Sequence, residues 1–257
     1  MARRTFAIGD IHGDLEALTT LMPRLGPLRS EDTLVFIGDY IDRGPDSAGV
    51  VRYLMELPDQ IDAQVVFLRG NHEDGWLRAL GGNWPQFVLP VNNGCLQAMD
   101  SFLGRPVSPP GTTPSAEDFE AFLTGSFFPP EVIEWMENLR WWYEDEHAIY
   151  VHAGLAQDDD GNFLHPSAAT GDKRTAMLWL RDKKFFRDYD GKLVVFGHTV
   201  TDHLPPELSS YTPDDPEDMW AGPACVGIDT GAGKGGFLTV IEFPARLVYE
   251  SRDPQTP

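Results

Sequence analysis

Five short segments of this chain place a carboxylate, amide or imidazole beside glycine, each directly after an apolar, strand-like run. They are Gly9-Asp10-Ile11-His12-Gly13, Gly38-Asp39-Tyr40-Ile41-Asp42-Arg43-Gly44, Gly70-Asn71-His72-Glu73, Val151-His152-Ala153-Gly154 and Phe196-Gly197-His198-Thr199. Open α/β sheets place their sites at the carboxyl ends of the strands. The repeated pattern therefore predicts an α/β chain whose ligand loops converge at one edge of a sheet.

The first third of the chain alternates strand and helix signals. Strand-like runs are expected at Thr5 to Ile8, Thr33 to Ile37 and Gln64 to Leu68, and helices at Leu15 to Leu25 and Ser47 to Leu57. This βαβαβ order predicts a parallel core sheet.

The remainder has a different character. From Gly75 to about Asp145 the chain is rich in Trp, Phe and Pro with helical spacing, so we expect a helical insertion (75–145) within a single domain spanning 1–257. Later strand signals lie at Ala148 to Val151, Leu193 to Phe196, Ala224 to Ile228, Phe237 to Phe243 and Arg246 to Tyr249. Their close succession predicts antiparallel pairing in a second sheet. Leu204 to Gly222 is expected as a surface loop, and the tail from Asp253 as mobile.

Charge and composition narrow the class of partner. Forty acidic residues against twenty basic ones give a net charge of -20, which argues against a nucleic-acid partner. No apolar run is long enough to span a membrane, and no removable signal peptide is expected. Cys95 and Cys225 lie far apart without a Cys-x-x-Cys spacing, which favours a reduced, cytoplasmic protein. Oligomeric state is left open.

The six ligand-type residues suit two divalent metal ions. They are Asp10, His12, Asp39, Asn71, His152 and His198. If the chain stays extended past its strand, Asp10 and His12 face the same way and can bind one ion. Asp39 has two oxygens and can bridge ions roughly 3.5–4 Å apart. The mixture of nitrogen and oxygen ligands favours manganese, with iron or zinc as alternatives, over calcium.

Residues between these ligands indicate a reaction. His72 must diverge from Asn71, its neighbour, and is free to act as a general acid, with Asp42 holding its other ring nitrogen. The guanidinium groups of Arg43 and Arg69 border the same loops and suit phosphate oxygens. Arg181 is a third candidate for phosphate binding, although an amphipathic helix would show it as well.

The five motifs, in this order, resemble the calcineurin-like metallophosphoesterase superfamily, in particular its phosphoprotein phosphatase branch with the small bacterial and phage serine/threonine phosphatases. The resemblance covers the sheet core and not the helical insertion. It implies an αββα fold, a two-sheet β-sandwich flanked by helices. It also implies that a hydroxide bridging the two ions attacks phosphorus in line, without a phosphoenzyme.

The resemblance also implies a role for each residue. Asp10, His12 and Asp39 would hold one ion, and Asp39, Asn71, His152 and His198 the other. His72 and Asp42 would form the acid dyad, and Arg43 and Arg69 would bind phosphate. The implied activity is hydrolysis of phosphomonoesters on a phosphorylated protein or a small phosphoester.

The main alternative is a symmetrical bis(5'-nucleosyl)-tetraphosphate hydrolase, which would share all six ligands. Such relatives typically lack an acid at Asp42, an arginine at Arg69 and a glutamate at Glu73, so the serine/threonine protein phosphatase is preferred. One departure from the bacterial phosphatases is Cys95, which follows Asn93-Gly94 where they carry a second glycine. An inactive scaffold and a phosphodiesterase are further alternatives, but no ligand or acid is missing.

Overall fold

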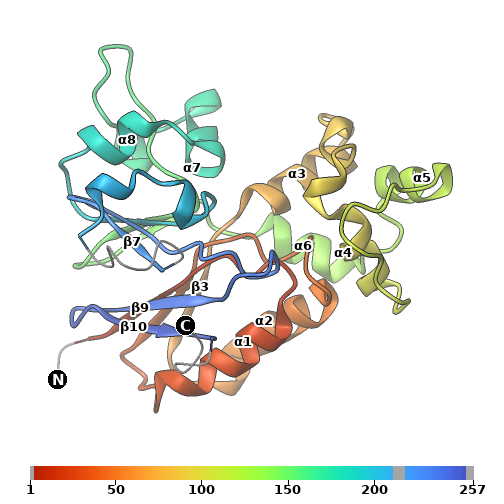
Figure 1. Ribbon diagram of the computed structural model, residues 1–257, viewed down its shortest axis with the longest axis horizontal. Coiled ribbons are helices and arrows are strands. Elements are labelled where there is room, and N and C mark those ends of the chain that lie inside the picture. The colour runs from red at the N-terminus through yellow and green to blue at the C-terminus, as the bar shows by residue number, and fades with distance from the viewer. Residues whose placement is uncertain (1–2, 211–217, 253–257) are drawn as a thin grey trace.

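The computed structural model describes residues 3–210 and 218–252, and these form two five-stranded sheets (Figure 1). The first sheet has the order β10-β9-β1-β2-β3, and the second the order β4-β5-β6-β8-β7. The first contains β1 (Thr5–Ile8), β2 (Thr33–Phe36), β3 (Gln64–Phe67), β9 (Thr239–Phe243) and β10 (Leu247–Glu250). The second contains β4 (Trp142–Glu144), β5 (Ile149–Val151), β6 (Val194–Phe196), β7 (Trp220–Ala221) and β8 (Cys225–Gly227).

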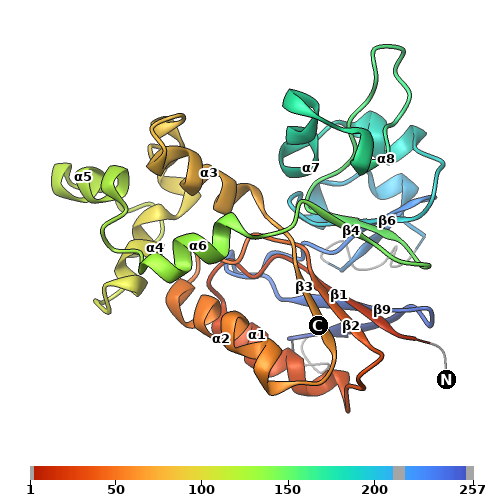
Figure 2. The same ribbon diagram turned by 180° about the vertical axis from the view of Figure 1, so that it is seen from behind.

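Two N-capped helices cover the outer face of the first sheet. Asp14 accepts a hydrogen bond from the amide of Ala17 (2.9 Å) and starts α1 (Leu15–Leu21). Asp46 does the same for the amide of Gly49 (2.8 Å) at α2 (Ser47–Gln60). The helix expected over Leu15 to Leu25 changes to a 3-10 turn at Met22–Leu25. Figure 2 shows α1 and α2 together on this face.

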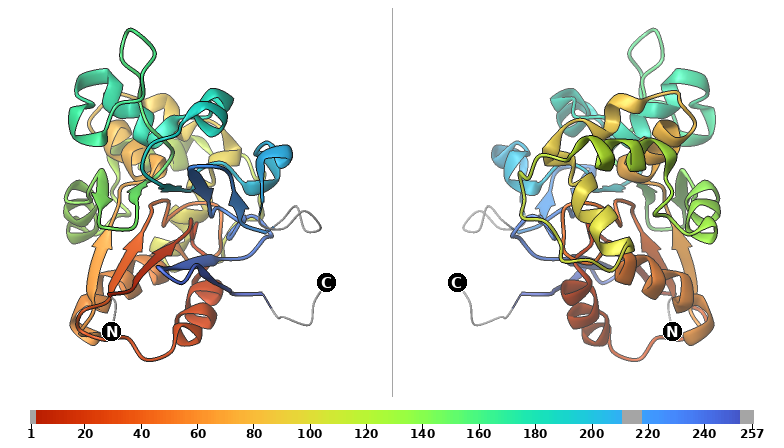
Figure 3. Two further views of the ribbon diagram at one scale, coloured as in Figure 1. Left: turned by 90° about the vertical axis from the view of Figure 1, so that its left-hand side faces the viewer. Right: turned by 90° about the vertical axis from the view of Figure 1, so that its right-hand side faces the viewer.

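The inner faces of the two sheets share a hydrophobic core. Alternate strand residues of the first sheet, such as Ala7 and Val35, pack with Tyr150, Val195 and Val226 of the second. Their neighbours along the strand point the other way, toward α1 and α2. The predicted two-sheet sandwich flanked by helices is therefore confirmed. In the side views, red α1 lies at the bottom and teal α7 and α8 at the top (Figure 3).

The closing strands occupy a different sheet from the one predicted. β9 and β10 pair antiparallel, as expected, but β9 continues antiparallel onto β1, with Thr5 opposite Phe243. They thus extend the first sheet. The second sheet has a parallel centre, β5-β6-β8, with antiparallel edges at β4 and β7. The short spacing between two strands along the chain predicts that they pair as a hairpin. It does not predict which sheet the hairpin joins.

The aromatic segment that links β3 to β4 along the chain is mainly helical between Asn71 and Glu137. It contains α3 (Asn71–Leu80), α4 (Cys95–Phe102), α5 (Ala116–Thr124) and α6 (Pro130–Glu137), with 3-10 turns at Pro85–Val88 and Val91–Asn93. The fully buried ring of Trp76 contacts four phenylalanines, namely Phe87, Phe122, Phe127 and Phe128. The helices therefore begin before the expected boundary at Gly75, and residues 142–144 inside the expected insertion form strand β4.

Between β5 and β6 lie α7 (Ala176–Trp179) and α8 (Lys183–Asp188), with 3-10 turns at Pro166–Ala168 and Gly171–Thr175. The expected surface loop from Leu204 instead includes a 3-10 turn (Pro206–Leu208) and β7, where buried Trp220 donates its indole N–H to the carbonyl of Pro205 (2.8 Å). A further 3-10 turn spans Thr201–His203. The middle of this loop and the tail from Asp253 lie outside the described residues. None of the described helices is both long and apolar enough to cross a membrane.

Buried Asp32, directly before β2, is expected to make the stability of the fold depend on acid pH. Burial alone would raise its pKa, but hydrogen bonds from the guanidinium groups of Arg4 and Arg29 outweigh burial and hold the pKa of Asp32 well below its usual range. A carboxylate of this kind stabilises the fold above its unfolded pKa of about 3.9, and that contribution is lost as the pH falls below this value.

Replacing Asp32 with Asn is therefore expected to lower the free energy of unfolding at pH 7 by about 1.5–3 kcal/mol, the usual loss for hydrogen bonds to a charged group. Urea unfolding from pH 7 stepwise to pH 3 measures the effect, and the gap between variant and parent should narrow below about pH 4. Exposed Asp59 on α2 provides the matched control, Asp59→Asn, which should change little. A gap that stays constant with pH would contradict the assignment.

Candidate metal and phosphate site

The loops that follow five strands bring the predicted ligands together. Asp10 follows β1, Asp39 follows β2, Asn71 opens α3 after β3, His152 follows β5 and His198 follows β6. Two groups of potential metal ligands share Asp39, and within each group the ligand atoms lie within 4.8 Å of one another. One group is His12, Asp39 and His72, and the other is Asp39, His152 and His198.

Asp39 presents one oxygen to each group. Its Oδ2 lies 3.3 Å from Nε2 of His12, and its Oδ1 lies 3.4 Å from Nε2 of His152. The Asp39 side chain is almost completely buried. A carboxylate that faces two imidazoles through different oxygens is placed to serve two ions at once.

Asn71 and Asp10 lie beside these groups. The amide oxygen of Asn71 is 3.0 Å from Nε2 of His152 and 2.6 Å from Nδ1 of His198. Oδ2 of Asp10 lies 4.0 Å from Nε2 of His12 and accepts the backbone N–H of His198 (3.0 Å). All six predicted ligands thus lie within one connected cluster.

Two of the imidazoles are oriented for metal binding. Nδ1 of His12 donates to the carbonyl of Ile41 (3.0 Å), and Nδ1 of His152 donates to the carbonyl of Ile37 (2.9 Å). Each of these bonds leaves the lone pair on Nε2, the nitrogen that faces Asp39. Burial lowers the pKa of both histidines, which favours the neutral form that a metal requires.

The donor set fits divalent ions. Burial, together with the nearby carboxylates of Asp229 and Asp39, raises the pKa of Asp10 well above its ordinary value. Divalent cations would offset this repulsion between buried carboxylates. Nε2 of His198 is also buried without a hydrogen-bond partner. These His and Asp residues are therefore positioned to bind metal.

The ligand loops turn through the left-handed backbone region. Among the described residues, six non-glycine residues have positive φ in this region, and five of them belong to these loops. They are His12 (47°), Asp39 (55°), Asp42 (72°), Arg43 (69°) and His198 (65°). An extended chain was expected from Asp10 to His12, but the positive φ of His12 shows that the chain turns there. The two side chains approach each other through this turn. Strain of this kind persists only where the surrounding structure holds it in place, and it concentrates at functional sites.

Glycine is required where two loops meet the carboxylates. A Cβ at Gly197 would lie 2.0 Å from Oδ1 of Asp10, and a Cβ at Gly70 would lie 2.2 Å from Oδ1 of Asp39. Real side chains do not approach so closely, so both ligand oxygens would have to move. The glycines in the motifs thus make room for the ligands.

His72 diverges from Asn71, as predicted, and points to a different partner. Its Nδ1 lies 2.6 Å from Oδ2 of Asp42, and its Nε2 lies 4.0 Å from Oδ2 of Asp39. The indole N–H of Trp76 also donates to Asp42 (3.0 and 3.1 Å). Trp76 was not predicted as a site residue, although it follows His72 by four residues and so lies on the same face of α3.

Two arginines lie at the ligand cluster. Nη1 of Arg43 is 2.5 Å from Nε2 of His12, and Nη1 of Arg181 is 3.4 Å from the hydroxyl of Thr199, next to His198. Burial lowers the pKa of Arg181, while the carboxylates of Asp39, Asp229 and Asp10 oppose that shift. Arg181 is therefore close enough to these carboxylates to respond to their charge.

Arg69 is directed to α6. Its Nη2 donates to the carbonyls of Met136 (3.2 Å) and Glu137 (2.8 Å) at the end of that helix, and its guanidinium lies 5.3 Å from the ring centre of Trp141. Arginine at a helix carboxyl end commonly satisfies the last carbonyls in this way. These contacts do not test the predicted phosphate-binding role of Arg69, which stays a prediction.

Glu73 joins the two central loops. Its carboxylate accepts the backbone N–H groups of Asp39 (3.0 Å), Tyr40 (2.9 Å) and Gly70 (2.9 Å). Burial and the neighbouring Asp39 raise the pKa of Glu73 to about 8, while the three N–H donors act in the opposite direction. Glu73 therefore positions the Asp39 loop and needs no contact with substrate to do so.

Asp229 and Lys234 complete the charge pattern, and neither was predicted from the sequence. Buried Asp229 lies 3.0 Å from Nζ of Lys234, and both charges act on Asp10. A signal for Asp229 was present in the sequence. It follows the apolar run ending at Ile228 and precedes Thr230-Gly231, so it too is an acid directly after a strand-like run and close to glycine.

Comparison with known proteins agrees with this geometry. The chain is 28% identical over 253 residues to the asymmetrical bis(5'-nucleosyl)-tetraphosphatase PrpE of Bacillus velezensis, covering 92% of this chain and 88% of that protein. It is 26% identical over 151 residues to a symmetrical bis(5'-nucleosyl)-tetraphosphatase of Nitrosomonas europaea, covering 59% and 44%. A crystal structure provisionally described as a diadenosine tetraphosphatase shares the fold, with a TM-score of 0.57 at 21% identity over 96% of this chain and 92% of that one.

The family assignment rests on a longer match. Residues 3–202 match the family described as Calcineurin-like phosphoesterase, and this span contains all five ligand loops. The sandwich fold and the Asp39-centred ligand groups agree with it. The chain therefore belongs to the calcineurin-like phosphoesterase family and is a phosphoester hydrolase.

Proposed function

We propose that this chain is a two-metal phosphohydrolase, and the observation that carries the proposal is Asp39 facing two ligand groups through its two oxygens. Asp10, His12 and Asp39 would hold one ion, and Asp39, Asn71, His152 and His198 the other. When bound, divalent ions would supply Lewis acidity and a lowered pKa for water. Manganese remains the first candidate.

The protein side chains divide the remaining work. Arg43 and Arg181 would bind the oxygens of the phosphate under attack. Water gives up one proton to solvent as its oxygen adds to phosphorus, the bond to the leaving oxygen breaks, and that oxygen takes a proton from Nε2 of His72. Asp42 holds the ring through Nδ1, so that the Nε2–H faces the reaction.

For the substrate, we propose a dinucleoside tetraphosphate cleaved asymmetrically, into a nucleoside triphosphate and a monophosphate. We expect the residues that determine substrate specificity to lie on the helical insertion. The similarity to asymmetrical tetraphosphatases extends over 92% of this chain, whereas the similarity to the symmetrical relative covers 59%. Arg69 and Glu73, which had favoured a protein phosphatase, make contacts within the protein, and these contacts favour neither substrate.

The second candidate is a serine/threonine protein phosphatase acting on a phosphorylated protein. The observation in its favour is the buried Asp42 and His72 pair. An alkoxide is a poor leaving group and gains most from a general acid, whereas a nucleotide phosphate is a better leaving group and gains less from one.

A substrate panel separates the candidates. The protein with manganese is tested on diadenosine tetraphosphate, a phosphoserine peptide and p-nitrophenyl phosphate, with an Asp39→Asn sample to detect contaminating phosphatase. We expect diadenosine tetraphosphate to give equal amounts of ATP and AMP by ion-exchange chromatography. Two equivalents of ADP would instead show symmetrical cleavage. Turnover of the phosphopeptide alone would establish the second candidate.

A further inference from the structure

A cavity of about 520 Å³ lies between the helical insertion and the glycine-rich segment 230–236, with Arg43 and Lys234 among its lining residues. We propose that this cavity binds one nucleoside of the dinucleoside tetraphosphate and that Lys234 binds the phosphate next to the one attacked. This inference rests on the proposed function, and it states where the nucleotide that leaves during cleavage would bind.

The cavity adjoins the reaction centre. Arg43 lines it and also reaches His12, with Nη1 2.5 Å from Nε2. Gly233 lines it from the other side, and a Cβ there would lie 2.3 Å from the carbonyl oxygen of His12. A group held in the cavity is therefore separated from the metal ligands by little more than the Arg43 side chain.

Two positively charged side chains line the cavity and favour the binding of an anion. In a chain of net charge -20, Arg43 and Lys234 both line this one space. Nζ of Lys234 pairs with buried Asp229 (3.0 Å). Its positive charge acts to lower the pKa of both Asp10 and His12. The Lys234 side chain is 22% exposed, so its ammonium can add a phosphate oxygen to its existing partner.

The remaining wall suits a nucleoside. Val91 and Pro110 supply apolar surface from the insertion. The amide nitrogen of buried Gln97 donates to the carbonyls of Ser108 (3.0 Å) and Pro109 (3.1 Å), which leaves its amide oxygen as an acceptor for the amino group of a base. The volume falls within the roughly 300–1,000 Å³ of small-molecule sites, with a few polar groups among apolar ones.

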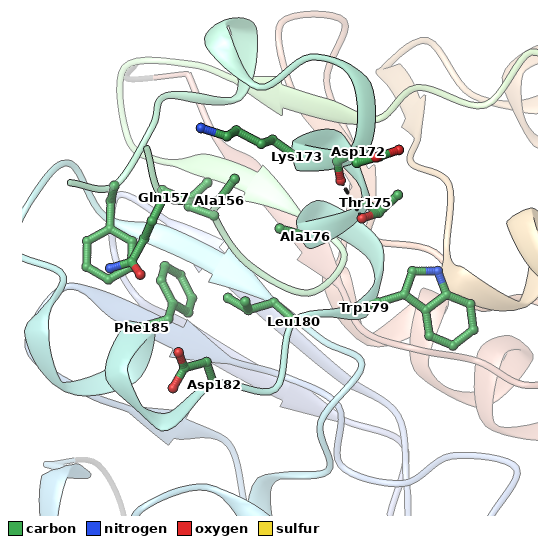
Figure 4. A pocket seen from close by; sticks show the side chains of 12 residues that line it. Ala156, Gln157, Asp172, Lys173, Thr175, Ala176, Trp179, Leu180, Asp182 and Phe185 are labelled. Atoms are coloured by element: carbon green, nitrogen blue, oxygen red, sulfur yellow. Dashed lines mark hydrogen bonds between the residues drawn. The ribbon is translucent and has the colours of Figure 1, made fainter. Parts of the chain in front are cut away.

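A lysine pair provides the test. Lys234→Gln is compared with Lys173→Gln, because Lys173 also pairs with an aspartate, Asp159 (2.7 Å), and lines a different cavity, beside α7 and α8 (Figure 4). Lys234→Gln should lower kcat/KM for diadenosine tetraphosphate about tenfold or more, mainly through KM, with a much smaller effect on p-nitrophenyl phosphate. Lys234→Arg should restore most of the loss, and Lys173→Gln should change neither substrate.

Lys234→Gln leaves buried Asp229 without its partner and could therefore disturb the fold. A second variant tests the cavity without this risk. Val91→Trp narrows the cavity without touching that pair, and it should raise KM for the tetraphosphate alone. ATP titrated calorimetrically into protein freed of metal by a chelator should bind more weakly to both variants.

Equal losses on both substrates would overturn the inference, because Lys234 would then act only through Asp10 and His12. Unchanged kinetics and unchanged ATP binding would overturn it as well. If the wild-type protein leaves the tetraphosphate intact, the proposed function fails instead, and that result is read before any variant is made.

Discussion

Replacing His72 with Asn will lower turnover about a hundredfold or more while both metal ions stay bound, because losing a general acid costs this much. The side chain interacts with Asp42 through Nδ1 at 2.6 Å and presents Nε2 toward Asp39 at a longer distance, 4.0 Å. Steady-state kinetics give kcat, and elemental analysis of the purified variant gives its metal content. The loss should be larger for a phosphoserine peptide than for p-nitrophenyl phosphate, whose leaving group needs less protonation.

A surface histidine offers a matched control for this result. His165 also pairs with a carboxylate, Glu144, at 2.9 Å, and His165→Asn should leave turnover unchanged. The competing assignment is that His72 binds metal, since it belongs to the ligand group with His12 and Asp39, and a carboxylate on Nδ1 also occurs behind metal-bound histidines. Loss of an ion from His72→Asn would establish that assignment and remove the acid from the mechanism.

Asp39→Asn is expected to weaken both ions together and to abolish measurable turnover. Asparagine keeps one oxygen, which can still accept the backbone N–H of His72 (3.0 Å), but it removes the charge that both groups share. The loss of affinity should exceed the roughly 10–100-fold that losing an outer partner of a metal ligand costs. Calorimetric titration with manganese measures both sites.

The other end of the same strand provides the control. Asp32 directly precedes β2 and Asp39 follows it, so Asp32→Asn changes a buried carboxylate at the opposite end of the strand from the ligands. It should lower stability and leave metal affinity unaltered. If Asp39→Asn lost one ion and bound the other normally, Asp39 would not be shared, and the two-metal proposal would need a different bridge.

The sequence was most informative where strand, ligand and glycine follow each other directly. The order of apolar run, glycine and acid at Asp10 and Asp39 predicted both the sheet and the edge at which ligands meet, because the side-chain period and the parallel order leave few alternatives. The divergence of Asn71 and His72 could also be predicted, since adjacent residues cannot point the same way in either regular structure.

What the sequence could not predict depends on contacts between distant segments. β9 could have joined either sheet, and its pairing with β1 is decided by the packing of both sheets. Arg69 neighbours the ligand loop in sequence, but the carbonyls that it binds come from α6, nearly seventy residues later. Lys234 lies far from the other motifs along the chain, and only folding brings it to Asp10.

The left-handed backbone at five residues of the ligand loops has a consequence for protein engineering. Each such residue costs on the order of 1–3 kcal/mol, and glycine would relieve the cost at every one. Three of the five, His12, Asp39 and His198, are proposed metal ligands. Directed evolution for heat tolerance alone would thus reward variants that have discarded their ligands, and any such campaign on this protein must select for turnover at the same time.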